Sequence, residues 1–133
     1  MKKSEISIPA NDPWFDTGVP LRRGVTCRID VPPGQEWTDW YVRCRPEGRT
    51  TWFQGLFRRW LRVAAEGERR AEFFTLVGTV GRSLRHAFLI GAGPRTFVPP
   101  VDGNLVCFAN DVPWGYWNNC GKITIHVTEQ SGG

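Results

Sequence analysis

Closely spaced glycine and proline residues are the feature that most restricts the folds open to this chain. Its 133 residues include 15 glycines and 10 prolines, spread along the whole length. Between these turn formers, apolar residues occupy every second position, most regularly in residues 25–31 and 123–127. Such alternation is typical of half-buried strands joined by turns. The pattern therefore predicts an all-β protein, an antiparallel β-sandwich of jelly-roll type.

One segment allows two interpretations. In residues 57–72, apolar side chains such as Phe57 and Trp60 fall at helical spacing. The same stretch can also form two strands around a turn at residues 66–67, as a hairpin that closes on residues 69–74. We favour the hairpin because the rest of the chain is typical of a β protein, and we expect little helix elsewhere.

Chain length and composition predict one soluble domain. A chain of 133 residues with 41% hydrophobic residues is long enough for one core, so we expect a single domain over 1–133, with flexible ends at 1–5 and 128–133. The first residues lack the apolar core of a signal peptide, and no run reaches the length of a membrane span. We therefore expect synthesis in the cytoplasm and no membrane insertion, with release outside the cell by a non-classical route left open.

The charge balance is modestly basic. Seventeen basic residues stand against 13 acidic ones, for a net charge of +4. A basic surface can bind nucleic acid or an anionic glycan, or it can simply keep the protein soluble. Arginines interleaved with aromatic residues make 57–72 the most basic stretch, but a solvated face with packed arginine stems is the commoner arrangement. We do not predict a nucleic-acid partner.

The sequence shows no recognisable motif of an enzyme or of a zinc site. The four cysteines form no C-x-x-C pair, so zinc is not expected; Cys27 and Cys107 lie in strand-like runs and are predicted to be buried thiols. Only two histidines are present, and no nucleophile elbow, carboxylate pair or phosphate-binding glycine loop stands out. The sequence therefore predicts a protein that is not an enzyme.

A polar loop between two strand-like runs is the strongest candidate for a binding site. Residues 110–121 carry a carboxylate at Asp111 and amide side chains at Asn118 and Asn119. Oxygen ligands of this kind suit calcium. The same loop holds two tryptophans, and an apolar ring beside clustered oxygens is the composition of a carbohydrate site. Alternatively, these polar residues only shape two consecutive turns.

The order and spacing of these residues resemble a known family. Asn110-Asp111-Val112-Pro113, then Tyr116, Asn118-Asn119 and Gly121, is similar to the calcium and sugar loop of the bacterial galactophilic lectins, called PA-IL-like. Shorter similarities occur at residues 8–19, 44–48, 88–91 and 97–100. The resemblance runs from about Ile6 to Val127 and is weak between Phe57 and Glu72. It implies a galactose-binding-domain-like sandwich and a dimer or tetramer.

The resemblance also implies a set of calcium ligands. Asp111 would supply its carboxylate, Asn118 and Asn119 their side-chain oxygens, and Gly115 its main-chain carbonyl. A further main-chain carbonyl would come from Thr38 or Trp40, because the alignment slips in that segment. Two adjacent hydroxyl groups of galactose or a galactose-like sugar would complete the coordination of the ion.

The sugar contacts implied by the family map onto five positions: Asp111, Val112, Asn118, Gln54 and Trp117. The first three would bind the sugar beside the metal, and Gln54 occupies the place of a sugar-contacting glutamine. The histidine that usually accompanies it is absent, which leaves the sugar specificity open. Trp117 either stacks on the sugar or blocks the pocket. The alternative to a lectin is a degenerate lectin fold that serves as a protein-interaction module.

Overall fold

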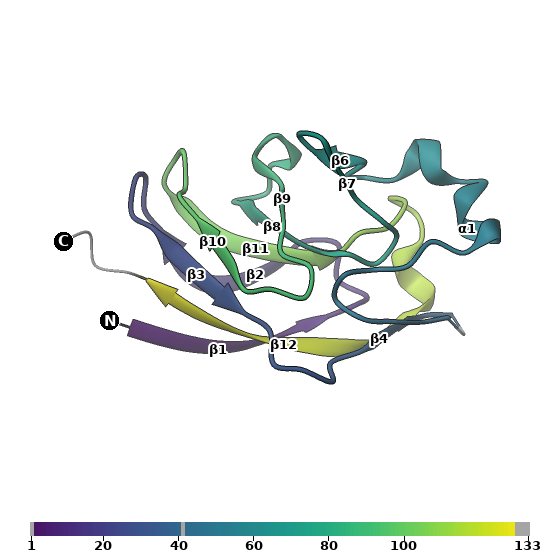
Figure 1. Cartoon of the computed structure of the whole chain (residues 1–133), viewed down its shortest axis with the longest axis horizontal. Helices are drawn as coiled ribbons and strands as arrows, with labels where there is room; N and C mark the ends of the chain where they lie inside the picture. Colours follow the sequence, from purple (N-terminus) through teal and green to yellow (C-terminus); the bar gives the residue numbers. More distant parts are fainter. Residues whose placement is uncertain (1, 41, 130–133) are drawn as a thin grey trace.

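The computed structural model describes residues 2–40 and 42–129, and Figure 1 shows two layers of antiparallel strands. The predicted antiparallel β-sandwich is confirmed. Helical structure is limited to one short α-helix and three single turns of 3-10 helix in these residues. No helix in the described part of the chain is long and apolar enough to cross a membrane.

The larger sheet is built around the last strand. Its members are β1 (Lys2–Pro9), β3 (Cys27–Asp30), β4 (Trp37–Asp39), β5 (Val42–Cys44), β10 (Arg95–Phe97) and β12 (Asn119–Glu129). The order is β10-β3-β12-β4-β5, and β1 pairs with β12 from the side. The first three residues of β12 pair with β4, and the remainder pairs with β1 and β3. The site loop, residues 110–121, therefore leads directly into the strand that holds this sheet together.

The smaller sheet has the order β2-β11-β8-β9. Its members are β2 (Phe15–Leu21), β8 (Leu76–Val80), β9 (Phe88–Leu89) and β11 (Gly103–Ala109). All five residues of β8 are buried, as are the last five of β11. Glycine at Gly78 is required for packing, because a Cβ there would lie 2.6 Å from the Phe88 ring.

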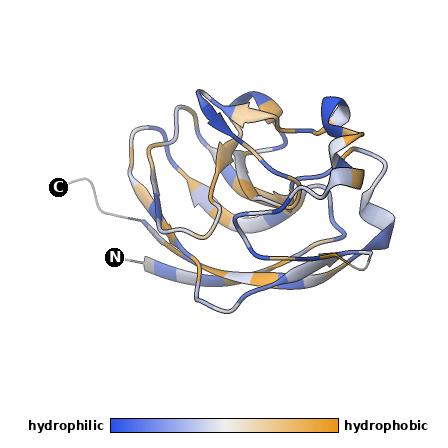
Figure 2. Cartoon of the chain, turned by 45° about the vertical axis from the view of Figure 1, so that its right-hand side comes forward, coloured by the Kyte–Doolittle hydropathy of each residue, from blue (hydrophilic) through white to orange (hydrophobic). Residues whose placement is uncertain are grey.

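The core lies between the two sheets. Alternate residues of β12, namely Ile123, Ile125 and Val127, point inward and are at most 2% exposed, while their neighbours are partly open to solvent. Figure 2 shows this alternation as orange and blue bands along the lower strands. Burial of such side chains contributes about 1.5–3 kcal/mol each and holds the sheets face to face.

Two of the four helical elements in the described residues lie in the connection between β5 and β8. It includes α1 (Trp52–Gly55), the 3-10 turn η1 (Arg58–Trp60) and a hairpin of β6 (Ala65–Glu66) and β7 (Arg69–Arg70). The hairpin is confirmed in a shorter form than predicted, and the helical spacing of Phe57 and Trp60 reflects only the single turn η1. The helix α1 was not predicted.

A local signal accounts for α1. Thr51 and Gln54 form a reciprocal capping box: Gln54 N donates to Thr51 Oγ1 at 3.2 Å, and Thr51 N donates to Gln54 Oε1 at 2.9 Å. A threonine followed three residues later by glutamine is the sequence signature of this motif. Two further 3-10 turns, η2 (Leu84–His86) and η3 (Tyr116–Asn118), complete the elements.

The expectation of flexible ends needs a correction at the N-terminus. Residues 2–5, expected to be a free end, form the start of β1 and pair with Glu129 to His126 of β12. Thr128 and Glu129 belong to β12 for the same reason, and residues 130–133 lie outside the described part of the chain. Eight consecutive pairs of backbone partners explain why this end is held.

The predicted burial of Cys27 and Cys107 is confirmed. Cys44 is buried as well, and Cys120 is exposed. Burial raises the pKa of Cys27 to about 11 and that of Cys44 to about 12, so both thiols stay protonated and unreactive at neutral pH.

Candidate functional site

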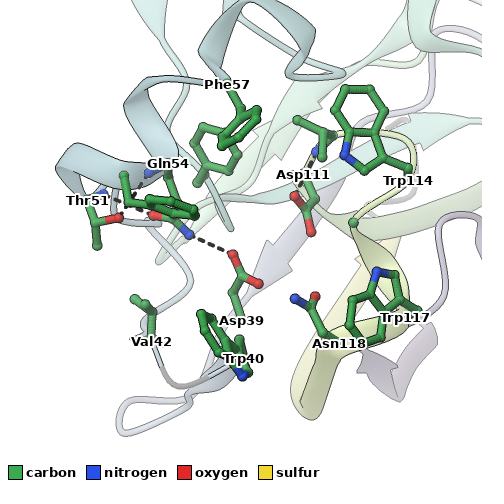
Figure 3. Close-up of a pocket in the computed structure, with 14 residues that line it drawn as sticks. Asp39, Trp40, Val42, Thr51, Gln54, Phe57, Asp111, Trp114, Trp117 and Asn118 are labelled. Atoms are coloured by element: carbon green, nitrogen blue, oxygen red, sulfur yellow. Dashed lines mark hydrogen bonds between the residues drawn. The ribbon is translucent and has the colours of Figure 1, made fainter.

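A pocket of about 270 Å³ opens between the site loop and the β4–β5 turn with α1 (Figure 3). The site loop forms one wall, with Asp111, Trp114 and Asn118. The opposite wall comes from β4, β5 and the start of α1, with Asp39 and Gln54. The pocket therefore joins segments that are more than 50 residues apart in the sequence.

Asp111 lies at the base of the pocket and is 3% exposed. Its Oδ1 accepts a hydrogen bond from the main-chain N of Val112 at 2.7 Å, and its Oδ2 accepts one from Asn119 Nδ2 at 3.0 Å. Two donors fix the carboxylate, yet each oxygen keeps further acceptor capacity. The group is therefore oriented without being fully satisfied.

Asn110, the residue before Asp111, holds this end of β11 in place. Its side chain is fully buried and makes three hydrogen bonds: Nδ2 donates to Val63 O at 2.7 Å and to Glu72 O at 3.0 Å, and Oδ1 accepts from Val63 N at 3.1 Å. The asparagine therefore ties the site loop to the segment that precedes β8. Sequence reasoning noted Asn110 only as part of a motif.

Two buried acceptor oxygens on the same loop have no hydrogen-bond donor among the described residues. They are Oδ1 of Asn118 and Oδ1 of Asn119. Asn119 is 4% exposed, and its Nδ2 donates both to Asp111 and to Ala10 O, at 3.1 Å. A buried acceptor without a partner costs about 1–3 kcal/mol, and Asn118 lines the pocket, so its oxygen is available to a ligand there. Asn119, predicted as a second side-chain ligand of the metal, is not part of the pocket wall and instead binds Asp111 and Ala10.

Gly115 leaves room for the Asp111 carboxylate. A Cβ at this position would lie 2.7 Å from Asp111 Oδ1 and 2.8 Å from Oδ2. The loop turns there, with Gly115 N donating to Val112 O at 3.0 Å. The absence of a side chain at this position is thus a steric requirement of this loop.

Asp39 supplies a second carboxylate from the opposite wall. In Figure 3 it points into the pocket from β4, and its Oδ2 accepts a hydrogen bond from Gln54 Nε2 at 2.7 Å. The sequence pointed to Asp39 only as an acid that could join Asp111, and it showed no carboxylate pair. The pairing of β4 with β12, which sets Asp39 opposite Asn119, creates one.

Both carboxylates are held in an environment that disfavours their charge. Burial, together with the negative charge of Asp39, raises the pKa of Asp111 from 3.8 to about 6, although the Asn119 and Val112 hydrogen bonds oppose the shift. Burial also raises the pKa of Asp39, against the effect of its bond to Gln54. The positive charge of Arg62 also opposes the shift of Asp111. Two neighbouring buried carboxylates of this kind are typical of a functional site.

The structure separates the two candidates for a main-chain ligand. Trp40 lines the pocket, and its N donates to Asn118 O at 3.0 Å, which ties the β4–β5 turn to the site loop. Thr38 pairs with Cys120 and Arg43 inside the sheet and is not part of the pocket wall. Trp40 also has φ of +56°, an uncommon backbone angle for a bulky residue that is often associated with function.

The predicted sugar contacts also lie at the pocket. Val112 and Gln54 line it, but the polar atoms of Gln54 are already engaged with Thr51 and Asp39. Trp117 stands at the rim beside Asn118 and is 84% exposed (Figure 3). A ring this exposed does not fill the pocket, so the geometry leaves Trp117 free to stack on a ligand.

A row of aromatic side chains extends from the pocket over α1 and η1. Ring contacts of 5.7–6.0 Å between centroids link Trp52, Phe53, Phe57, Trp60 and Trp114 in succession. These rings are 37–82% exposed, in contrast to the aromatic residues between the sheets. The row was not predicted as a unit, because its members come from two segments of the chain.

Two arginines of the basic stretch contact the protein itself. Arg62 Nη1 donates to Pro13 O at 2.8 Å and to the Tyr116 hydroxyl, and its guanidinium lies 3.9 Å from the centre of the Phe108 ring. Arg58 Nη2 donates to Ala71 O at 2.6 Å. These arginines support the loop rather than forming an open basic surface.

The donor set suits calcium better than zinc. Among residues 2–40 and 42–129, no group of three or more histidine, cysteine or acidic residues is placed to hold a metal. The pocket offers two carboxylates, amide oxygens and main-chain carbonyls instead. Calcium accepts such mixed, hard oxygen ligands, with two carboxylates available to balance its charge.

Comparison with known proteins agrees with this architecture. No protein-family model matches the chain, and no curated protein matches its sequence. The fold is a β-sandwich of antiparallel sheets with a pocket at one end. In particular, the chain is similar in fold to a solved structure described as the EclA N-terminal domain, a PllA-like lectin: the TM-score is 0.61, the sequence identity is 19%, and 95% of each chain is covered.

Proposed function

We propose that the protein is a calcium-dependent lectin that binds galactose or a sugar with similarly arranged hydroxyl groups. The observation that carries the proposal is the convergence of Asp39 from β4 and Asp111 from the site loop on one pocket, whose wall also holds the Asn118 amide oxygen that has no donor among the described residues. A bound divalent cation would satisfy that oxygen and neutralise the carboxylates. The lectin fold of the neighbour described above and the resemblance of the loop support the same assignment.

Some residues of the site would bind the ion, and others would orient its ligands. Asp111 and Asn118, with main-chain oxygens of Gly115 and Trp40, would hold the ion, and Asn119 would orient Asp111 through their shared hydrogen bond. The bound ion would supply two positions for neighbouring hydroxyl groups of the sugar. Because hydroxyl groups compete with water for any hydrogen-bonding site, a fixed metal gives the orientation that hydrogen bonds alone lack.

The rest of the pocket would contact the sugar's carbon face. Val112 and Phe57 contribute apolar surface, and the exposed Trp117 ring offers a platform for stacking at the rim. An apolar wall with a few fixed polar groups is the usual composition of a small-molecule site.

Thermal unfolding with calcium and sugar tests the proposal. Calcium should raise the melting temperature of the wild type, and galactose should raise it further only when calcium is present, because each ligand stabilises the folded state it binds. A panel of galactose, glucose, mannose and fucose, run with calcium and again with chelator, defines specificity. If neither calcium nor any sugar shifts the transition, the lectin assignment is wrong.

A protein-interaction module is the second candidate. The exposed aromatic row, Trp52 to Trp114, is the observation that favours it, since exposed apolar surface of this kind often marks a protein contact. In that case the protein would bind its partner equally well in chelator, and Asp111→Asn would leave binding unchanged.

A further inference from the structure

A second hollow, of about 690 Å³, lies directly beside the site pocket. The two share four wall residues, Trp40, Val42, Thr51 and Phe53, so a second sugar linked to one in the site pocket lies within reach of the second hollow. The second hollow also reaches residues that the first does not, from β5 and from the segment before α1. These residues give it a different chemical character.

Positive charge distinguishes the second hollow. Arg43 and Arg49 line it, both are exposed, and no acidic residue is part of its wall. Among the described residues, neither arginine forms an ion pair with a carboxylate. Nearby Glu72 accepts a hydrogen bond from Thr50 and lies 3.5 Å from Arg58, so its charge is already matched by another arginine.

Aromatic rings and hydroxyl groups complete the wall. Trp40 and Trp52 are 68% and 82% exposed, and Thr50 and Thr51 belong to the same wall. Exposed indoles offer faces on which a pyranose ring can stack, and guanidinium groups bind carboxylate and sulfate through paired hydrogen bonds. The combination matches a sugar that carries a negative charge.

We propose that this second hollow is a subsite for an acidic sugar residue, carboxylated or sulfated, that is linked to the sugar in the site pocket. The proposal rests on the lectin function proposed above and specifies its ligand as an acidic oligosaccharide. Arg43 and Arg49 bind the anionic group, and Trp52 stacks on the ring that carries it. The metal-centred pocket holds the neighbouring neutral residue.

Titration calorimetry on the full chain, with calcium present, tests this assignment with pairs of ligands that differ only in charge. Lactose and galactosyl-β-1,4-glucuronate both carry a terminal galactose, and their second rings differ in that glucose has a hydroxymethyl group where glucuronate has a carboxylate. Lactose sulfated at O6 of its glucose is the sulfated counterpart. Wild-type protein should bind the acidic member of a pair about five- to tenfold more tightly, because two exposed charge pairs are each worth up to about 1 kcal/mol. The preference should weaken as salt is raised.

Substitutions assign the effect to the two arginines. Arg43→Gln with Arg49→Gln should abolish the preference for the acidic ligands and leave the affinity for lactose and galactose unchanged. Arg82→Gln removes the same kind of charge from an exposed position that lines neither hollow, and it should keep the preference. Trp52→Ala should weaken binding of all these disaccharides but spare galactose.

The outcomes separate the two proposals. Equal binding of acidic and neutral ligands by the wild type, with calcium dependence intact, overturns the acidic subsite alone. Absence of binding by every ligand overturns the lectin function and the subsite together. Calcium-independent binding of a single-stranded oligonucleotide that is lost in the double arginine variant, with no sugar preference, would assign the hollow to nucleic acid instead.

Discussion

The two walls of the pocket are built in opposite ways. The site loop is tied down by internal hydrogen bonds, and its oxygens converge: Asn110 makes three bonds, Asp111 accepts two, and Asn119 bridges Asp111 to the start of the chain. The facing wall, around α1 and η1, has a capping box and a row of exposed rings. A metal ion needs ligand atoms held at fixed positions, which the site loop provides. Exposed rings can contact sugars of different shape, so the facing wall is suited to select what binds beside the ion.

The largest expected effect comes from removing the buried charge of the site loop. Asp111→Asn keeps the shape and one oxygen of the side chain but deletes a carboxylate, so calcium affinity should fall about a hundredfold or more and sugar binding should disappear with it. Calorimetry with calcium measures the change. Glu68→Gln, which neutralises an exposed acid outside the pocket, should bind like the wild type.

Stability should depend most on Asn110. Asn110→Ala removes three buried hydrogen bonds and leaves Val63 and Glu72 backbone groups without partners, so the free energy of unfolding should fall by about 2–4 kcal/mol. Denaturant unfolding measures this loss. Asn104→Ala, at an exposed amide that bonds only Asp16, should cost less than about 1 kcal/mol, and an equal cost at both sites would contradict the special role of Asn110.

The space beside Asp111 can be filled to test the geometry of the loop. Gly115→Ala places a Cβ against the carboxylate and should weaken calcium binding about tenfold by displacing Asp111. Gly55→Ala is the control on the facing wall, since a Cβ there meets only Thr50 at 3.9 Å. If both variants bind calcium normally, the fit between residue 115 and Asp111 does not matter for the ion.

The raised pKa of Asp111 predicts a pH dependence of stability without calcium. Because its folded-state pKa is about 6 against 3.8, the folded chain holds this proton more tightly than the unfolded chain. The contribution of Asp111 to the free energy of unfolding should therefore be greatest below about pH 4 and should fall as the pH rises through 6. Asp111→Asn should remove this fall in stability between pH 4 and 6. Calcium should reduce the fall in the wild type, because it binds the charged carboxylate.

The smallest expected effect concerns the facing wall. Trp60→Ala should cost less than about 1 kcal/mol of stability, because the ring is 40% exposed and packs mainly on other exposed rings. The sequence also predicts a dimer or tetramer, which light scattering can test. If the aromatic row forms the contact between copies, Trp60→Ala should shift the wild-type assembly toward the monomer.

The sequence by itself determined the β class and the core strands. Alternation at residues 123–127 follows from the two-residue period of strands, which is a local property. The polar loop with Asp111, Asn118 and Asn119 could be selected because its residues lie within a few positions of one another. Even the missed helix α1 had a local signal, the Thr51–Gln54 capping box.

Only the tertiary structure decided what faces that loop. Asp39 becomes a second carboxylate of the pocket because β4 pairs with the start of β12, a contact across 80 residues of chain. Lys2 to Glu5 are held for a similar reason, since β12 supplies their partners from the other end of the protein. The aromatic row and the arginine-lined hollow likewise join segments that no periodicity relates. Long-range strand pairing sets these neighbours, and spacing within a single segment carries no information about it.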